Sequence, residues 1–281
     1  MTSFTSASSW PPFSTGSKVA EDHPVLSWSR MVLIGVATGA LSGLLGVGGG
    51  IVMVPSLVAF GFSRHRANGT SLGAIFLVAL SGAIAFAVAG DLDWQMGVTL
   101  GIGGLIGSTL GANLMNRLRG NTLGLIFGVI LLVTGLRMVL AGEPLVEGRV
   151  IDPFLRIVIG VLVGMVAGLA SGLAGVGGGV VMVPAMVFFL GLDQHMAEGT
   201  SLLAILFTAV AATRINARNR HIDWRAMLVL GLVGAAIAPL AALLAQSISG
   251  PTLTRVFGVL VVLMAVRTIL RSRQVPETAP T

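Results

Sequence analysis

Two glycine-rich segments with the same sequence, GVGGG, contain the residues best suited to hold a solute. They span residues 46–50, named here the first glycine break, and residues 175–179, the second glycine break, and each interrupts an apolar stretch. Glycine permits positive φ and close approach, and a helix that starts after such a break presents uncapped N–H groups with about half a positive charge. The breaks are therefore candidate anion sites that need no charged side chain. Tight helix packing is the alternative use of the same glycines.

Two Gly-Thr-Ser triplets, at residues 69–71 and 199–201, each open a long apolar run after a polar segment. Thr and Ser in such positions are natural N-caps, and capping alone would account for them. As a functional hypothesis, their hydroxyl and N–H groups complete an anion site beside the opposite break. Asn68 and Glu198 precede the two triplets at equivalent positions. They are the candidate coupling residues, because Glu198 could carry a proton, although a solvated loop acid is the simpler interpretation.

The composition predicts a membrane protein. The chain has 281 residues, of which 54% are hydrophobic and 10% charged, and its mean hydropathy is +0.94. A soluble domain carries about 25% charged residues, so a water-soluble fold is excluded. Cysteine is absent, which excludes thiolate metal sites and Cys nucleophiles, and with only four histidines we expect no metal and no cofactor. Neither a nucleotide-binding GxxxxGK(S/T) motif nor HExxH occurs, so no catalytic residues are predicted and no enzyme is expected.

The arginines indicate membrane topology and not nucleic-acid binding. They lie in pairs and clusters between apolar runs, as Arg64 with Arg66 and Arg117 with Arg119, without interleaved aromatic residues. Such placement is typical of polytopic proteins, because cytoplasmic loops collect positive charge. The expected partners are membrane lipid and a small anionic substrate, with no nucleic acid. The oligomeric state is left open.

Ten apolar runs without the alternation of a barrel predict an all-α polytopic membrane protein. Residues 42–58 match residues 171–187 at 13 of 17 positions, so the chain is a tandem duplication with five runs in each copy. The runs are 31–47, 50–62, 70–90, 96–116 and 122–141, then 157–174, 179–192, 199–213, 226–246 and 252–270. The predicted organisation is a disordered Ser/Thr/Pro-rich tail at 1–27, a first transmembrane repeat at 28–141, a linker at 142–155, a second transmembrane repeat at 156–270 and a C-terminal tail at 271–281.

Loop charges predict that the two repeats have opposite orientations in the membrane. The loop 61–69 is basic and its counterpart 192–198 is acidic, and every other equivalent loop also changes sides under the positive-inside rule. This pattern is typical of the inverted repeats of secondary transporters. Inversion requires an odd number of crossings, so each repeat should consist of a Gly-broken helical hairpin, re-entrant or strongly tilted, and three full spans. The total is six spans and two hairpins, or ten crossings if the hairpin arms are complete, and a window method would report about eight. Both termini are expected to be cytoplasmic.

The paired GVGGGxVMVP and AxGTSL motifs at the start of each repeat resemble those of the sulfite exporter TauE/SafE family of bacterial permeases. The resemblance covers nearly the whole chain apart from the N-terminal tail. It implies transport of sulfite, sulfoacetate, thiosulfate or related organosulfur anions, without selecting one of them. It maps candidate substrate-binding residues onto Gly46, Gly48, Gly49, Gly50, Gly69, Thr70 and Ser71 in the first half, and onto Gly175, Gly177, Gly178, Gly179, Gly199, Thr200 and Ser201 in the second.

The sequence therefore predicts a secondary membrane transporter, or permease, of small anions. Sulfite and organosulfur anions are the substrates that the resemblance implies, and the plasma (inner) membrane is the expected location. A passive anion channel and a non-transporting membrane scaffold are the alternatives. The direction of transport and the coupling ion are not determined by the sequence.

Overall fold

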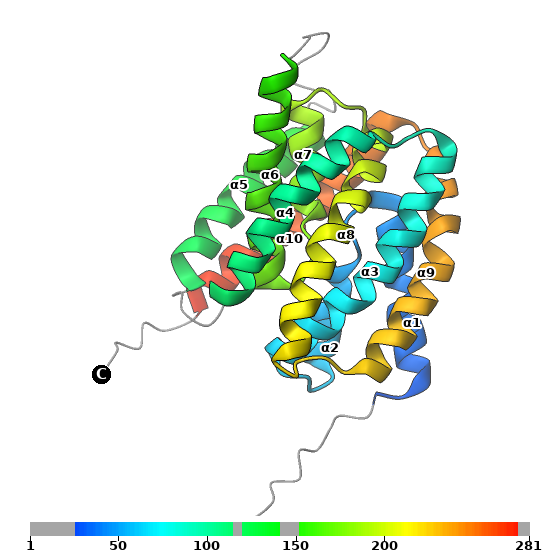
Figure 1. The fold of residues 1–281 in the computed structure, drawn as a ribbon, viewed down its shortest axis with the longest axis vertical. Helices are drawn as coiled ribbons and strands as arrows, with labels where there is room; N and C mark the ends of the chain where they lie inside the picture. The colour runs from blue at the N-terminus through cyan, green and yellow to red at the C-terminus, as the bar shows by residue number, and fades with distance from the viewer. Residues whose placement is uncertain (1–25, 115–119, 141–151, 275–281) are drawn as a thin grey trace, which may run out of the picture.

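The computed structural model describes residues 26–114, 120–140 and 152–274. Most of the predicted N-terminal tail, of the linker and of the C-terminal tail lies outside these residues, as does most of the basic loop at 116–121. The described residues form ten helices and no strand. Figure 1 shows them gathered into one bundle. The all-α prediction is confirmed.

Each repeat contributes five helices in the same order. The first repeat contains α1 (Trp28–Leu45), α2 (Gly50–Ala59), α3 (Arg64–Ala89), α4 (Trp94–Leu114) and α5 (Gly120–Leu140). The second contains α6 (Pro153–Ala174), α7 (Gly179–Phe189), α8 (Gln194–Arg218), α9 (Trp224–Gln246) and α10 (Gly250–Gln274). Thus α1 corresponds to α6, and so on to α5 and α10. The glycine breaks separate α1 from α2 and α6 from α7.

The helix lengths fit a multi-pass membrane protein. Six helices of the described residues are long and apolar enough to cross a membrane, namely α1, α3, α6, α8, α9 and α10. α4 and α5 have 21 residues each, which at about 1.5 Å per residue give about 31 Å, close to the thickness of the hydrocarbon core. α2 and α7 have only 10 and 11 residues. The hairpins are therefore unequal, with a first arm of spanning length and a second arm of about half that length.

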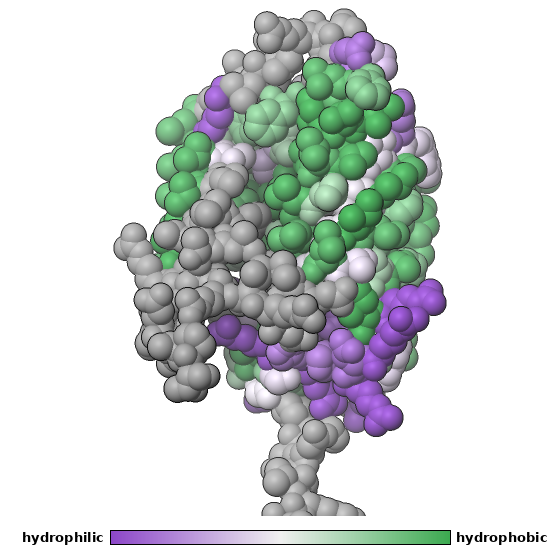
Figure 2. Space-filling model, turned by 60° about the vertical axis from the view of Figure 1, so that its left-hand side comes forward, coloured by the Kyte–Doolittle hydropathy of each residue, from purple (hydrophilic) through white to green (hydrophobic). Residues whose placement is uncertain are grey.

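The surface of the bundle also fits a membrane protein. Figure 2 shows hydrophobic side chains over the flank of the bundle and hydrophilic side chains gathered mainly at its lower end. Many large apolar side chains of the described residues are strongly exposed, among them Val88, Leu140 and Leu162. Such a surface suits contact with lipid and not with water.

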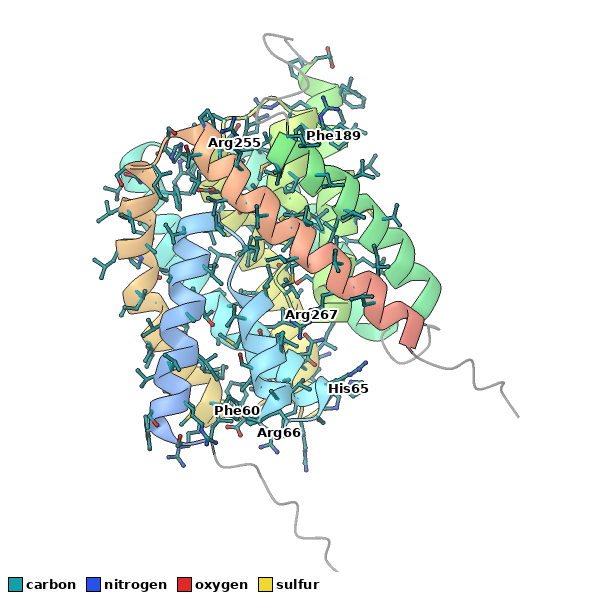
Figure 3. The ribbon with its side chains drawn as sticks, turned by 180° about the vertical axis from the view of Figure 1, so that it is seen from behind. Phe60, His65, Arg66, Phe189, Arg255 and Arg267 are labelled. Carbon is teal, nitrogen blue, oxygen red and sulfur yellow. The ribbon has the colours of Figure 1, made fainter. Side chains whose placement is uncertain are left out.

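The two hairpins enter the bundle from opposite ends. Figure 3 places Phe60, just after α2, at the lower end with Arg66, and Phe189, the last residue of α7, at the upper end with Arg255. In Figure 1, α3 runs upward while its counterpart α8 runs downward. The repeats are thus inverted relative to each other, as the loop charges predict.

Contacts between the repeats follow a pseudo-two-fold arrangement. α3 and α8 pack together, α1 packs on α9 as α6 packs on α4, and α5 packs on α10. Gly39 of α1 lies against the backbone of Gly234, and Gly107 of α4 lies against the carbonyl of Met165, so a Cβ at either glycine would overlap the facing helix. Close approach of this kind is how small residues join membrane helices. Glycines outside the breaks thus serve the packing of one repeat on the other.

Two helices begin earlier than the apolar runs predict. α3 starts at Arg64 and α8 at Gln194, six and five residues before the runs that open at residues 70 and 199. Ser63 and Asp193 are the N-caps, and each side-chain oxygen accepts the N–H three residues on, at 3.3 Å and 3.0 Å. A cap of this kind lets a polar segment join the helix. The interpretation of the Gly-Thr-Ser triplets as N-caps is therefore wrong, because both triplets lie inside their helices.

Candidate functional site at the two glycine breaks

Both glycine breaks have the same backbone conformation. Gly46, Gly48 and Gly49 have φ of 64°, 75° and 73°, and their counterparts Gly175, Gly177 and Gly178 have φ of 71°, 96° and 90°. These left-handed values favour glycine strongly, because a Cβ would crowd the neighbouring carbonyl. The chain therefore ends one helix and starts the next within four residues, deep in an apolar bundle.

The two breaks lie against each other. A Cβ built on Gly50 would lie 2.5 Å from the carbonyl oxygen of Gly175 and 2.7 Å from Cα of Val176. On the other side, a Cβ on Gly179 would lie 2.6 Å from the carbonyl oxygen of Gly46. The first residue of each short arm thus packs on the break of the other repeat. Two hairpins from opposite ends of the molecule meet at this point.

The short arms begin here with uncapped N-termini. The N-cap residues of α2 and α7 are Gly49 and Gly178, and neither N-terminus has a side-chain cap. The first N–H groups of a helix have no partner within the helix, and each N-terminus carries about half a positive charge. α1 and α6 also end at these breaks, at the C-caps Gly46 and Gly175, so the meeting point combines N–H groups and carbonyl groups without a charged side chain.

Two buried isoleucines pack at the meeting point. Ile75 of α3 and Ile205 of α8 occupy equivalent positions, and both are fully buried. A Cβ on Gly48 would lie 3.2 Å from Cγ2 of Ile75 and 3.3 Å from Cδ1 of Ile205, and a Cβ on Gly177 would lie 3.6 Å and 3.7 Å from the two Cγ2 atoms. Together they form an apolar plug between the breaks. Sequence reasoning missed this pair, although each isoleucine follows a triplet serine by four residues and so shares its helix face.

The triplet serines brace the breaks. The hydroxyl of Ser71 donates to the carbonyl oxygen of Gly175 at 3.1 Å, and the hydroxyl of Ser201 donates to the carbonyl oxygen of Gly46. Each serine thus binds the break of the opposite repeat. The expected proximity of the triplets to the opposite breaks holds for these two hydroxyls.

The other triplet residues face the opposite repeat away from the breaks. The hydroxyls of Thr70 and Thr200 accept the backbone N–H groups of Asp223 and Asp93, at 2.9 Å and 3.0 Å. Gly69 packs on the carbonyl of His221 and Gly199 packs on the carbonyl of Asp91. These four residues join helix α3 or α8 to the start of α9 or α4. They are not at the meeting point of the breaks.

Asn68 and Glu198 lie beside the opposite breaks. The amide of Asn68 donates to the carbonyl oxygen of Gly172 at 3.2 Å. A Cβ on Gly46 would lie 2.6 Å from Cα of Glu198. The Glu198 side chain is fully buried, and its Oε1 accepts from Nε2 of Gln194 at 2.7 Å. The interpretation of Glu198 as a solvated loop acid is wrong, because α8 begins before it and turns it inward.

The lower end of the bundle carries most of the exposed positive charge. Exposed arginines gather where α1, α3, α8 and α9 begin or end at this level, at Arg30, Arg64, Arg214, Arg218, Arg220 and Arg225. Arg66 forms an ion pair with Asp223 at 3.1 Å. The rings of His65 and His221 lie 5.2 Å apart, and burial, followed by the nearby His65, lowers the pKa of His221. The upper end carries Asp91, Asp193 and an Arg156–Asp93 ion pair.

Neither a metal cluster nor a polar cavity accompanies the breaks among the described features of the structure. No three His, Asp or Glu side chains of the described part lie together as metal ligands would. A cavity of about 410 Å³ lies between α3, α4 and α8, and its lining is apolar, with Leu80, Trp94 and Leu203 among the lining residues. An anion would find no hydrogen-bond donor side chain there except that of Trp94.

Comparisons with known proteins agree with this architecture. The family model described as "Sulfite exporter TauE/SafE" matches residues 3–138 and 160–281. The chain is similar to a "Probable membrane transporter protein" of Xylella fastidiosa (strain 9a5c), with 33% identity over 87% of this chain and 96% of the relative. It is also similar to the "Probable membrane transporter protein YunE" of Bacillus subtilis (strain 168), with 25% identity over 75% of this chain and 89% of the relative. No solved structure matches the chain. With two inverted repeats, two glycine breaks and a family match over most of its length, the chain belongs to the sulfite exporter TauE/SafE family and is a multi-pass membrane transporter.

Proposed function

We propose that this protein is a secondary transporter of small sulfur-containing anions, sulfite or an organosulfonate, and that the meeting point of the glycine breaks is where the anion binds. The proposal is carried by one observation, the approach of the uncapped N-termini of α2 and α7 from opposite ends of the bundle. The family match supports the substrate class.

The electrostatics favour an anion of low charge. Two helix N-termini, each with about half a positive charge, begin at the meeting point of the breaks. A sulfite or sulfonate group presents several oxygens that can accept their N–H groups. The two ion pairs of the described residues involve Arg66 and Arg156, both at the ends of the bundle. Without a fixed arginine or lysine at the breaks, the anion can be held and then released.

The inverted hairpins support alternating access. In transporters built from inverted repeats, one repeat rocks or opens against the other around a central site. Here each short arm packs on the opposite break and Ile75 and Ile205 fill the space between them. An anion can enter only if one hairpin moves away from this contact. Because the hairpins come from opposite ends of the bundle, movement of one hairpin opens the meeting point to one side of the membrane, and movement of the other opens it to the opposite side.

The arginines support an orientation in the plasma (inner) membrane. Positive residues collect on the cytoplasmic side of membrane proteins, so the arginine-rich lower end is proposed to face the cytoplasm. α1 begins and α10 ends toward this end. Both chain termini are then cytoplasmic.

Flux measurements on the purified full chain in proteoliposomes test the proposal. We expect saturable uptake of radiolabelled thiosulfate, sulfite or sulfoacetate, accelerated by the same unlabelled anion on the opposite side. Absence of flux for all three anions, or selective flux of cations, would contradict anion transport. Unsaturable flux without counterflow would identify a passive channel instead.

A further inference from the structure

Glu198 is a buried acid without a compensating charge. Among the residues whose side chains the structure describes, it is the one buried Asp, Glu, Lys or Arg, and it is fully buried. The equivalent residue in the first repeat is Asn68, an amide that cannot take up a proton. The duplication has therefore placed a single protonatable group at this position, in one repeat only.

The hydrogen bonds of the carboxyl leave one oxygen without a partner. Oε1 accepts from Nε2 of Gln194 at 2.7 Å, and Oε1 of Gln194 in turn accepts from the hydroxyl of Thr254 on α10 at 3.3 Å. Oε2 of Glu198 is buried and has no hydrogen-bond partner. A protonated carboxyl has an O–H on one of its two oxygens. Gln194 fixes the oxygen that accepts, and so assigns the proton to Oε2.

The surroundings disfavour a negative charge on this carboxyl. The charged groups that act on it are Asp193 on the same helix and Asp91 in the loop after α3, both acids. His195 instead lies against the carbonyl oxygens of Ala245 and Ile248 at the end of α9, at 3.1 Å and 3.2 Å. A buried charge without a partner is far more costly than a neutral acid. In this conformation Glu198 is therefore a carboxylic acid.

The backbone connects this acid to the first glycine break. The hydroxyl of Ser201 lies within hydrogen-bond distance of two carbonyl oxygens, those of Glu198 and Gly46. The backbone of Glu198 also packs directly on Gly46. A hairpin movement that separates α1 from α8 must break both contacts. The same movement exposes the carboxyl of Glu198 to water, so that its proton can exchange.

We propose that Glu198 is the proton carrier that couples anion movement to a proton gradient, an inference that rests on the proposed function. An ionised Glu198 beside the first break would repel an anion held there, whereas the protonated acid would not. Anion binding and proton binding therefore favour each other, and both leave on the side to which the site opens. At that side the O–H bond of Glu198 breaks, the proton passes to water and a carboxylate remains until it takes up a new proton. One proton accompanies each anion in the same direction.

The test compares two transport modes of the full chain in proteoliposomes, with thiosulfate as the probe because this anion takes up no proton near neutral pH. Exchange of labelled for unlabelled thiosulfate needs no proton release, whereas net accumulation driven by a pH gradient does. Glu198→Gln keeps the shape of the protonated acid. We expect it to reduce gradient-driven accumulation by about tenfold or more, a usual size for linked binding of two ligands, and to leave exchange within about twofold. Asp91→Asn, which neutralises a neighbouring acid that is only half-buried, is the matched control and should behave as wild type.

Each outcome is decisive. Wild-type accumulation by Glu198→Gln, or loss of exchange together with accumulation, would overturn the assignment of Glu198 as the proton carrier and leave anion transport standing. A pH-sensitive dye inside the vesicles should record proton entry with thiosulfate in the wild type and none in the variant. Equal proton entry in both would also overturn it. Absence of any anion flux in the wild type would instead contradict the proposed function itself.

Discussion

Gly177→Ala is the sharpest perturbation of the proposed site. A Cβ at Gly177 would lie 3.4 Å from the carbonyl oxygen of Val47, 3.6 Å from Cγ2 of Ile75 and 3.7 Å from Cγ2 of Ile205, all ordinary contacts. The closed arrangement therefore has room for the methyl group, and the variant should fold. Its cost to stability is the strain of alanine at positive φ, about 1–2 kcal/mol. The anion, in contrast, would lose space at the meeting point of the breaks.

The expected loss of transport follows from one hydrogen bond. If the methyl group removes one N–H contact to the anion, affinity falls by about 1.5–3 kcal/mol, which is about 10- to 150-fold. Gly90→Ala is the matched control, because Gly90 has φ of 88° against 96° for Gly177 and nothing lies within 4 Å of its Cβ position. Both variants should lose the same thermal stability, and only Gly177→Ala should lose anion uptake in proteoliposomes. Equal uptake by the two variants would refute the placement of the anion at the breaks.

Three further predictions concern residues around the site. Ile205→Val should cost about 1 kcal/mol of stability and raise uptake of larger sulfonates relative to sulfite in competition assays, because the plug becomes smaller; an unchanged ratio would contradict the plug. Ser71→Ala and Ser201→Ala should each lower the free energy of unfolding by about 1 kcal/mol, seen as similar shifts in thermal melting, since each removes a bond to a break carbonyl; strongly unequal shifts would contradict the pseudo-symmetry. His221 has its pKa lowered by burial and then by His65, so the unfolded chain binds this proton more tightly. Its contribution to stability should be present above the ordinary histidine value near 6.5 and be lost as the pH falls below it; His221→Asn should flatten that slope in thermal melts, and an unchanged slope would contradict the pKa shift.

The helix starts show where local sequence was insufficient. Hydropathy places the beginning of α3 and α8 at the Gly-Thr-Ser triplets, because the residues before them are polar. Ser63 and Asp193 instead cap the helices earlier. The polar residues of the extra turns find partners far away in the chain, as Arg66 does with Asp223 of the opposite repeat and His195 with carbonyl groups at the end of α9. A single run of sequence does not reveal those distant partners. The triplets consequently act as bonds between repeats, a role that only the fold determines.

The burial of Glu198 is a second feature that local sequence did not predict. In the sequence it follows a polar loop, where an acid is usually solvated. In the structure it lies fully buried against Gly46, a residue about 150 positions earlier in the chain. Its difference from Asn68 is visible in the aligned repeats. Its burial depends on helix packing, which no local pattern specifies.

The sequence by itself determined that the protein lies in a membrane, that it is a tandem duplication, that its two repeats are inverted and where the glycine breaks lie. Each of these depends on composition, on repetition along the chain or on the charges of the loops. Long apolar helices require lipid around them. Basic loops that change sides between the two repeats require the repeats to have opposite orientations in the membrane. Only the tertiary structure decided that the breaks touch, that Ile75 and Ile205 fill the space between them and that Ser71 and Ser201 bind the opposite breaks. These are contacts between repeats separated by about 130 residues of chain, and the geometry of packing sets them.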